Sequence, residues 1–332
     1  MKVTISDVAR LAGVSTATVS HTINSTRYVS SDTKEKVYQA IAQLGYTPDA
    51  SARSFRTGKK KTVGFIVPDI SNKFFGTLIE SAENYLSAKG YHLIIANTKE
   101  NMDREETNLR LLTAGLVDGL LIASTMDDFQ RLDNLIPAGF PVVLIDRTFD
   151  TPKYPSVSVS CFQPIYRSVC CLAGQGKRRI GIIGGLPRLS TTKERVAAYR
   201  AAVADCGLPQ DEALIRYGDS MEDSAPPCLN QLLEQGCDAI LVCQGLMASV
   251  TIAYLRGQGI RLGQDLELVS FVDYDTHAYE FYYSQVDRII QPVEKLGRTA
   301  GEQILLRVEQ PDAPVQERVL TSVYRPRGEE SV

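Results

Sequence analysis

The chain has 332 residues, enough for a small terminal domain followed by a two-lobed body. Its 7 cysteines all lie from Cys161 onward with no C-x-x-C pair, and no run of about eighteen apolar residues occurs, so neither a zinc site, a disulfide framework nor a membrane span is expected. The formal net charge is −3, yet residues 1–61 hold ten Lys/Arg against four Asp/Glu, which leaves the rest strongly acidic. A basic end suits contact with phosphates, although a tail that only aids solubility is the simpler alternative.

Residues 4–24 have the pattern of two short helices joined by a tight turn. Ser6 and Asp7 could cap the first helix, Gly13 could end it in a left-handed conformation, and Ser15 could cap the second. The outer face of the second helix is small and polar. This is the pattern of a helix-turn-helix, whose second helix enters the major groove, although an ordinary helical hairpin has it too. The apolar residues that would face inward are Val8, Ala9, Leu11, Ala12, Val19 and Ile23.

A third helix is predicted from Ser31, and its apolar residues are spaced to close a three-helix core. The stretch at 51–61, Ser-Ala-Arg-Ser-Phe-Arg-Thr-Gly-Lys-Lys-Lys, then follows. Its first six residues suit one or two helical turns but are too few to form a stable helix alone. The three lysines at 59–61 are interpreted as a solvated linker within the phosphate field, with no base contact.

From residue 62 onward, short apolar runs alternate with helical patterns. This alternation predicts doubly wound parallel sheets, and its restart after a weaker break at 151–160 predicts two lobes. Ligands of such sheets bind at the carboxyl ends of the strands, which places a site in the cleft between lobes. The predicted strands are 62–68, 91–96, 119–123, 142–145, 179–183, 213–216, 239–243, 267–272 and 318–323. The predicted helices are 74–89, 104–114, 129–136, 165–173, 192–206, 221–234, 248–257 and 292–308.

The headpiece, the basic stretch and the two-lobed body occur in the order found in the LacI/GalR (lactose-repressor) family, which the chain resembles over essentially its whole length. The resemblance implies an α + α/β fold: a helix-turn-helix headpiece at 1–47, a hinge at 48–61 and a periplasmic-binding-protein-like core at 62–332. It also implies that the chain crosses between the lobes three times. Lobe 1 would then contain about 62–160 and 292–319, and lobe 2 about 161–291 and 320–332.

For DNA, the resemblance implies that Thr16, Ala17 and His21 occupy base-reading positions. Ala17 can offer only an apolar contact, for example to a thymine methyl group. His21 could donate to a guanine acceptor or lie against a phosphate. The positions that fit phosphate contact or helix capping are Thr4, Ser15, Thr18, Ser20 and Asn24.

In the family, the hinge folds on the operator, pairs with its dimer mate in the minor groove and inserts an apolar side chain between bases. The matching residue here is Phe55, and phenylalanine wedges occur among minor-groove binders. Alternatively, Phe55 packs against the body. Its neighbours Arg53, Ser54 and Arg56 complete the hinge candidates.

The candidates for binding a small-molecule effector in the cleft are residues that follow the predicted strands. Those after the first strand, Ser71, Asn72, Phe74 and Phe75, offer polar groups and aromatic faces, although Asn72 could merely cap a helix and the phenylalanines could be core. Asp146 follows the strand at 142–145. The other candidates, taken from loops matching the family's cleft, are Ser190, Thr191, Arg195, Gln244, Asp273 and Gln291.

Several features of the sequence limit which effector and which activity can be expected. The Gly-rich loop at 184–195 lacks the spacing of a phosphate-binding P-loop, so an NTPase is not expected. Gln244 and Gly245 stand where relatives often have Asn-Asp, and Cys161 begins a segment where many have an aspartate, so the effector could differ from theirs. Neither a Ser-His-acid nor a Cys-His arrangement is apparent, so we expect neither catalysis nor a cofactor or metal.

Together these observations predict a cytoplasmic, dimeric, ligand-controlled regulator that binds a pseudopalindromic operator, most simply as a repressor of carbohydrate-related genes. The expected effector is a sugar or sugar phosphate. Two alternatives remain: a small-molecule sensor without operator-specific DNA binding, and a cleft hydrolase.

Overall fold

The computed structural model describes residues 3–24, 27–46, 59–151, 153–219, 224–272 and 285–328. Residues 1–60 and 61–332 form two separate compact units. Within the described ranges, every helix is too short or too polar to cross a membrane.

The first unit is a three-helix bundle of α1 (Ile5–Ala12), α2 (Thr16–Asn24) and α3 (Ser31–Leu44). Gly13 ends α1 with a φ of 65°, a left-handed conformation that glycine adopts without strain because it has no Cβ. The helix begins at Ile5, so the predicted cap by Ser6 was wrong, whereas Asp7 does take part in the cap as predicted. Thr4 is the N-cap residue, and the Asp7 carboxylate accepts hydrogen bonds from the Thr4 backbone N–H at 3.0 Å and from its hydroxyl at 2.7 Å. The small core consists of Val8, Ala9, Val19, Val37 and Ala40.

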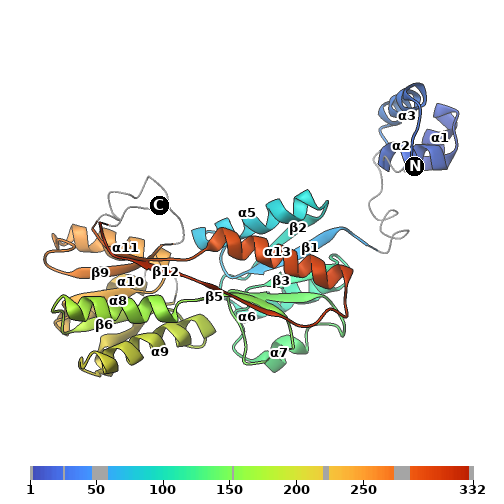
Figure 1. Ribbon diagram of the computed structural model, residues 1–332. Helices are drawn as coiled ribbons and strands as arrows, with labels where there is room; N and C mark the ends of the chain where they lie inside the picture. Colours follow the sequence, from blue (N-terminus) through green and yellow to red (C-terminus); the bar gives the residue numbers. More distant parts are fainter. Residues whose placement is uncertain are drawn as a thin grey trace. The chain divides into compact units, whose positions relative to one another are not determined.

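Lobe 1 of the second unit is built on a six-stranded parallel sheet in the order β11-β5-β4-β3-β1-β2. α5 (Lys73–Ala88) and α13 (Val293–Glu309) cover one face, and α6 (Met102–Thr113) and α7 (Phe129–Asp133) cover the other (Figure 1). The strands are β1 (Thr62–Val67), β2 (His92–Asn97), β3 (Gly119–Ile122), β4 (Val142–Ile145), β5 (Ser156–Ser160) and β11 (Glu317–Thr321).

Lobe 2 repeats this plan in the order β12-β10-β9-β8-β6-β7, parallel except that β12 runs antiparallel to β10. α8 (Phe162–Gly174) and α9 (Ser190–Asp205) cover one face, and α10 (Ala225–Glu234) and α11 (Gly245–Gly257) cover the other. A 3-10 turn, Glu212–Leu214, precedes β7. The strands are β6 (Ile180–Gly184), β7 (Ile215–Tyr217), β8 (Ala239–Val242), β9 (Glu267–Val272), β10 (Asp287–Ile290) and β12 (Val323–Arg325).

The central strands are almost wholly apolar because helices cover both of their faces. Phe65 and Ile66 of β1, for example, are fully buried on opposite sides of the sheet. The predicted fold class is confirmed, and most predicted elements occur with their ends shifted by a few residues. Two strands, β5 and β10, were not predicted, and the strand predicted at 318–323 is two strands in different sheets.

The chain crosses between the lobes at three places, after β5, after β10 and between β11 and β12. Two crossings are joined directly, because the Ser160 carbonyl accepts hydrogen bonds from the Ser322 N–H at 3.1 Å and from its hydroxyl at 2.9 Å. Glu194 of α9 accepts from the Ser160 hydroxyl at 2.6 Å and from the Cys161 N–H at 3.3 Å. The first and third crossings are therefore connected to each other and to α9.

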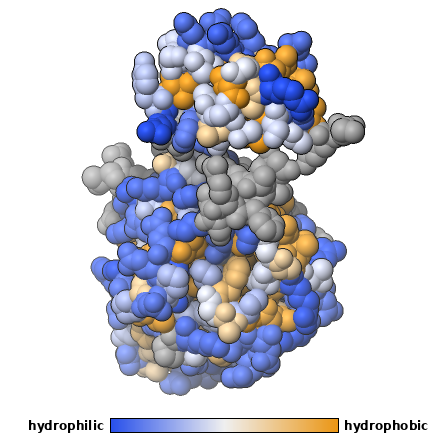
Figure 2. Space-filling view, turned by 90° about the vertical axis from the view of Figure 1, so that its right-hand side faces the viewer, coloured by the Kyte–Doolittle hydropathy of each residue, from blue (hydrophilic) through white to orange (hydrophobic). Residues whose placement is uncertain are grey.

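One edge of the lobe 1 sheet is open. Ile94 and Ile95 of the edge strand β2 are 39% and 47% exposed, although neighbouring residues of a strand face opposite sides. Figure 2 shows apolar side chains gathered among hydrophilic ones on the surface of the second unit. An uncovered apolar sheet edge is a surface that proteins normally cover by association.

Candidate functional site

The N-terminal half of α2 presents small polar side chains to solvent. Ser15, Thr16 and Ala17 are exposed, whereas Val19 on the opposite face is fully buried. The Ser15 hydroxyl accepts from the Thr18 N–H at 3.1 Å and lies 2.9 Å from the Thr18 hydroxyl, so these two cap α2. The helix can therefore present its exposed side without losing its buried face.

The other headpiece candidates lie along the same helix or just before α1. Ser20, His21 and Asn24 are half-buried, and the Asn24 amide donates to the Ser20 carbonyl at 2.8 Å. Thr4 is exposed and caps α1 as described above. The hinge candidates Arg53, Ser54, Phe55 and Arg56 lie outside the described residues.

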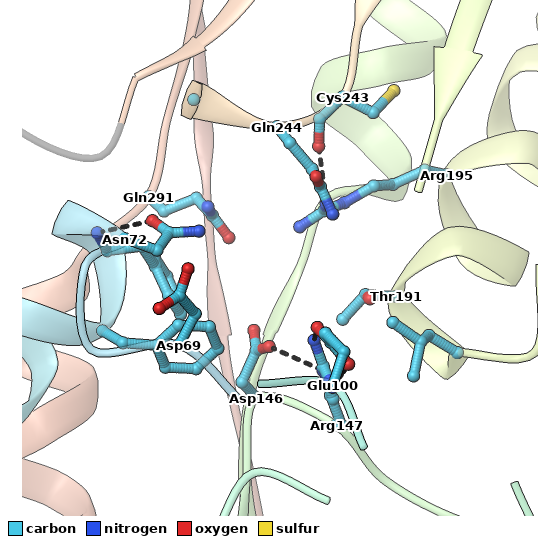
Figure 3. A pocket seen from close by; sticks show the side chains of 14 residues that line it. Asp69, Asn72, Glu100, Asp146, Arg147, Thr191, Arg195, Cys243, Gln244 and Gln291 are labelled. Atoms are coloured by element: carbon cyan, nitrogen blue, oxygen red, sulfur yellow. Dashed lines mark hydrogen bonds and ion pairs between the residues drawn. The ribbon is translucent and has the colours of Figure 1, made fainter. Parts of the chain in front are cut away.

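The cleft between the lobes holds a cluster of polar side chains from loops that follow the strands. Figure 3 shows Asp146, Arg195, Gln244 and Gln291 converging on one space from four different elements. The full set of described residues that line it is Asp69, Asn72, Phe74, Phe75, Glu100, Asp146, Arg147, Leu189, Thr191, Arg195, Cys243, Gln244, Gly245 and Gln291.

Asp146 lies directly after β4 in a strained backbone conformation. Its φ is 64°, and the Arg147 N–H donates to the Ile145 carbonyl at 2.6 Å, which closes a three-residue turn around it. Burial raises the pKa of its carboxyl, an effect that the nearby charges of Arg147 and Arg195 only partly oppose. Such strain and desolvation are found where a side chain is held for function.

Arg195 is the principal donor on the lobe 2 side. It belongs to the second turn of α9, where its guanidinium donates to the Cys243 carbonyl at 2.7 Å and lies 4.4 Å from the centre of the Phe271 ring. Only 7% of Arg195 is exposed. The carbonyl and the aromatic ring fix its orientation toward the cleft.

The loop after β1 contributes both polar and aromatic groups. Asn72 caps α5 by accepting from the Phe74 N–H at 3.0 Å, while its side chain also lines the cleft. Phe74 and Phe75 pack edge to face with ring centres 5.1 Å apart and are nearly fully buried, so they are core residues whose surfaces reach the cleft. Ser71 is exposed, bonds to Asp69 and is absent from the lining.

A pair of opposite charges forms one wall. The Arg147 guanidinium binds both carboxylate oxygens of Glu100, at 2.5 and 3.0 Å, and donates to the Ser124 carbonyl at 3.2 Å. Both side chains are largely buried. Arg147 is thereby neutralised within lobe 1 by Glu100.

A larger cavity of about 700 Å³ opens beside this space and shares Arg147 and Leu189 with it. Ser190 lies there rather than in the deeper site, and its hydroxyl accepts from the Thr148 N–H of lobe 1 at 3.0 Å. Arg188 of lobe 2 donates to the Thr125 carbonyl of lobe 1 at 3.2 Å. These contacts bridge the two lobes at the mouth of the cleft.

Six lining residues were not among the candidates predicted from the sequence: Asp69, Glu100, Arg147, Leu189, Cys243 and Gly245. Asp69 and Glu100 follow β1 and β2, so the rule that ligands bind at the carboxyl ends of strands could have found them. Cys243 contributes its main chain, which no side-chain pattern reveals. The candidate Asp273 lies outside the described residues.

The described arrangement can bind a small polar molecule, because carboxyl, amide and guanidinium groups surround one space. Across the part of the chain that the structure describes, no group of His, Cys, Asp and Glu is arranged to hold a metal ion. The carboxyls of Asp69, Glu100 and Asp146 outnumber the guanidiniums of Arg147 and Arg195 by one. Two of these carboxylates already contact a cation, because Glu100 is paired with Arg147 and Asp69 with Lys99.

Comparison with known proteins identifies both units. Residues 4–49 match the family described as bacterial regulatory proteins, lacI family, and residues 60–324 match periplasmic binding proteins and the sugar binding domain of the LacI family. The chain is 34% identical to the HTH-type transcriptional repressor PurR of Photobacterium profundum, and 32% identical to that of Pasteurella multocida. Each of these matches covers 92% of both chains.

Among solved structures, the chain is similar to a complex of the transcriptional regulator CelR with cellobiose, at 26% identity and a TM-score of 0.73. That match covers 99% of this chain and 100% of the other. A Lac repressor dimer bound to operator and the anti-inducer ONPF matches with a TM-score of 0.84 and 23% identity over 98% of this chain and 99% of the other, which supports the fold.

Proposed function

The chain belongs to the LacI family of bacterial regulatory proteins, and on this basis we propose that it represses carbohydrate-related genes under the control of a neutral sugar bound between its lobes. As a family member it is a ligand-responsive DNA-binding transcriptional regulator rather than an enzyme, and it acts on operator DNA as a cytoplasmic dimer.

The observation that carries the sugar assignment is the buried carboxyl of Asp146, which faces amide and guanidinium groups across the cleft. A carboxylate accepts hydrogen bonds from hydroxyls, and amides both donate and accept, so together they match the alternating donors and acceptors of a sugar. Arg195 supplies a further donor. Glu100 is paired with Arg147 and Asp69 with Lys99, so these charges are already balanced within the protein, and we assign a neutral sugar rather than a sugar phosphate.

On the DNA side, we assign base contacts to Thr16, Ala17 and His21 of α2 and phosphate contacts to its polar neighbours. The exposure of Thr16 and Ala17 supports this assignment. Phe55 remains our candidate for the minor-groove wedge of the hinge. The exposed Ile94 and Ile95 of β2 offer an apolar surface that a second copy of the chain could cover.

A thermal-shift screen tests the effector class. Neutral mono- and disaccharides, sugar phosphates and nucleobases are added to the full-length protein, and we expect one or more neutral sugars to raise the melting temperature by several degrees, because a ligand that binds only the folded state stabilises it. If only sugar phosphates or only nucleobases stabilise the protein, the neutral-sugar assignment is wrong.

Operator binding is then measured with a pseudopalindromic duplex selected from a random-sequence library, with and without each stabilising ligand. We expect selective binding that the ligand changes by about 5- to 150-fold. Ligand binding without any sequence-selective DNA binding would instead support the alternative of a small-molecule sensor.

A further inference from the structure

Two thiols meet in lobe 2, on the face of its sheet that α8 and α9 cover. The sulfur of Cys170 in α8 lies 3.1 Å from the sulfur of Cys206, which directly follows α9. Both cysteines are free thiols, and both are partly exposed. The pair lies away from the groups that line the effector cleft and is not explained by the proposed function.

A hydrogen bond beside the thiols holds the two helices in this alignment. The Tyr166 hydroxyl donates to the Asp205 carboxylate at 2.8 Å. Tyr166 precedes Cys170 by one helical turn, and Asp205 is the neighbour of Cys206, so the tyrosine–aspartate bond and the thiol pair lie side by side between the same two segments. α8 and α9 lie next to each other on the sheet (Figure 1).

We propose that Cys170 and Cys206 are an oxidative modification site that forms a reversible disulfide between α8 and the end of α9. The sulfurs need to approach by only about 1 Å to reach the S–S bond length of about 2.05 Å. Intracellular disulfides of this kind are usually transient and respond to oxidants.

The oxidant that we assign is a low-molecular-weight disulfide, RSSR. One protein thiolate attacks it, so an S–S bond forms between the protein and one RS group while the other leaves as RS⁻. The second protein thiolate then attacks the protein sulfur of this mixed disulfide and releases the second RS⁻. The two cysteines lose two electrons and two protons in total, and RSSR gains them to become two RSH.

The surroundings predict how fast this reaction runs. Burial, and then the neighbouring thiol of Cys206, raise the pKa of Cys170 to about 11, so little of it is thiolate at neutral pH. We therefore expect slow formation of the disulfide at neutral pH and a rate that increases as the pH is raised toward 10.

The other cysteines, all within described parts of the chain, provide controls. Cys161, Cys237 and Cys243 are buried, and the half-buried Cys171 and Cys228 have no thiol partner among the described contacts. Cys228 is the closest match, because it is similarly accessible but its thiol donates to the Tyr217 carbonyl.

The full-length protein is incubated with oxidised glutathione, alkylated, digested without reductant and analysed by mass spectrometry. We expect one peptide pair joined through Cys170 and Cys206, lighter than the two separate peptides by two hydrogens and separated by dithiothreitol. Protein that carries only glutathione adducts, or joins other cysteines instead, would overturn the proposal.

Three variants test the specificity of the pair. Cys170→Ser and Cys206→Ser should each abolish the joined peptides and leave a glutathione adduct on the remaining partner, whereas Cys228→Ser should form them at the wild-type rate. Because the joined peptides are detected in the wild-type protein itself, the proposal stays testable even if a serine variant folds poorly. Equal yields in all three variants would show that the pair is not special.

Discussion

At the scale of single residues, Asp146 combines two costs, a left-handed backbone and a buried carboxyl. Its φ of 64° is tolerated better by aspartate and asparagine than by other residues with a side chain. Its raised pKa means that the folded protein disfavours its ionised form. A residue that reduces stability in this way is better explained by binding than by folding.

We predict that Asp146→Asn stabilises the ligand-free protein and weakens effector binding by about 10- to 100-fold, since one charged hydrogen-bond acceptor is lost. The pKa of Asp146 is higher in the folded than in the unfolded state, so its ionisation destabilises the fold as the pH rises through the folded pKa. The advantage of the variant should therefore grow as the pH rises above the ordinary carboxyl pKa of 3.8. Thermal melts at increasing pH and calorimetric titration of the effector measure both effects.

Asp69→Asn is the matched control, because the same substitution at this position should lower the stability of the ligand-free protein instead of raising it. Burial raises the pKa of Asp69, but hydrogen bonds from Ser71 and the nearby Lys99 outweigh this and lower it. A lowered pKa means that ionised Asp69 stabilises the fold above its unfolded pKa, and this contribution is lost as the pH falls through the folded pKa. The control variant should melt lower than wild type at neutral pH. A shift of both variants in one direction would contradict this account.

At the scale of elements, α2 separates a buried face from an exposed one, so its exposed face can be changed without unfolding the headpiece. We predict that Ala17→Glu reduces operator affinity at least about 10-fold, because it places a carboxylate beside bases and phosphates. Its helix content should match that of wild type, since surface substitutions usually change stability by about 0.5 kcal/mol or less. Fluorescence anisotropy with labelled operator and circular dichroism measure the two properties.

Gln39→Glu makes the same charge change on the exposed side of α3. It should reduce operator affinity only slightly, because added charge distant from the interface acts through the screened field alone. Equal losses in the two variants would mean that overall charge, rather than the face of α2, determines DNA binding.

Strands could be predicted where they are continuously apolar, and helices where their apolar residues recur at helical spacing. Segments whose conformation depends on pairing with residues distant in the sequence could not be predicted. β5 reads Ser-Val-Ser-Val-Ser, an alternation that suits a strand, but Pro152 and Pro155 just before it indicated a break. It forms a strand because β4 and β11 pair with it on both sides. β10 begins with the buried Asp287, whose carboxylate accepts hydrogen bonds from the Tyr324 hydroxyl and the Arg327 N–H, both near the C-terminal end of the chain. Neither partnership is visible in local sequence.

The cleft was predictable to a similar degree. Strand ends pointed to Asn72 and Asp146, and the structure brings both to one cleft because parallel strands bring their carboxyl ends together. Gln244, which was taken from the family resemblance, lines the same cleft. Ser71 was expected in the site for the same reason, but it turns outward to bond with Asp69. The main-chain role of Cys243 depends on the position of Arg195, which only the packed helix α9 sets.

At the scale of the whole core, the structure is that of two lobes held together at both ends of the cleft. Two of the three crossings are joined at Ser160 and Ser322 on one side, and Arg188 and Ser190 bridge the lobes at the mouth. The deep site has a free volume of only about 50 Å³, room for a few waters at about 10–15 Å³ each. If a sugar binds here as we propose, we expect it to enter only when the lobes separate and to shift the population between open and closed forms.

We predict that Arg188→Ala weakens effector binding by about 5- to 13-fold without altering the deep site. The substitution removes the hydrogen bond to the Thr125 carbonyl and the 3.9 Å approach to Glu100, both of which cross between the lobes. Loss of about 1–1.5 kcal/mol from the closed form lowers its population, and apparent affinity falls by the same factor. Calorimetry measures the affinity, and small-angle scattering should show a more open ligand-free protein.

Lys193→Ala removes a cation from the same cavity, but Lys193 is exposed and has no lobe-bridging contact among the described residues. It should leave the affinity within about twofold of wild type, because surface charges contribute little. If it weakens binding as much as Arg188→Ala, the effect of Arg188 is electrostatic attraction of the ligand. If Arg188→Ala changes neither affinity nor scattering, the lobes are held closed by the crossings alone, and the contacts at the mouth do not control access to the site.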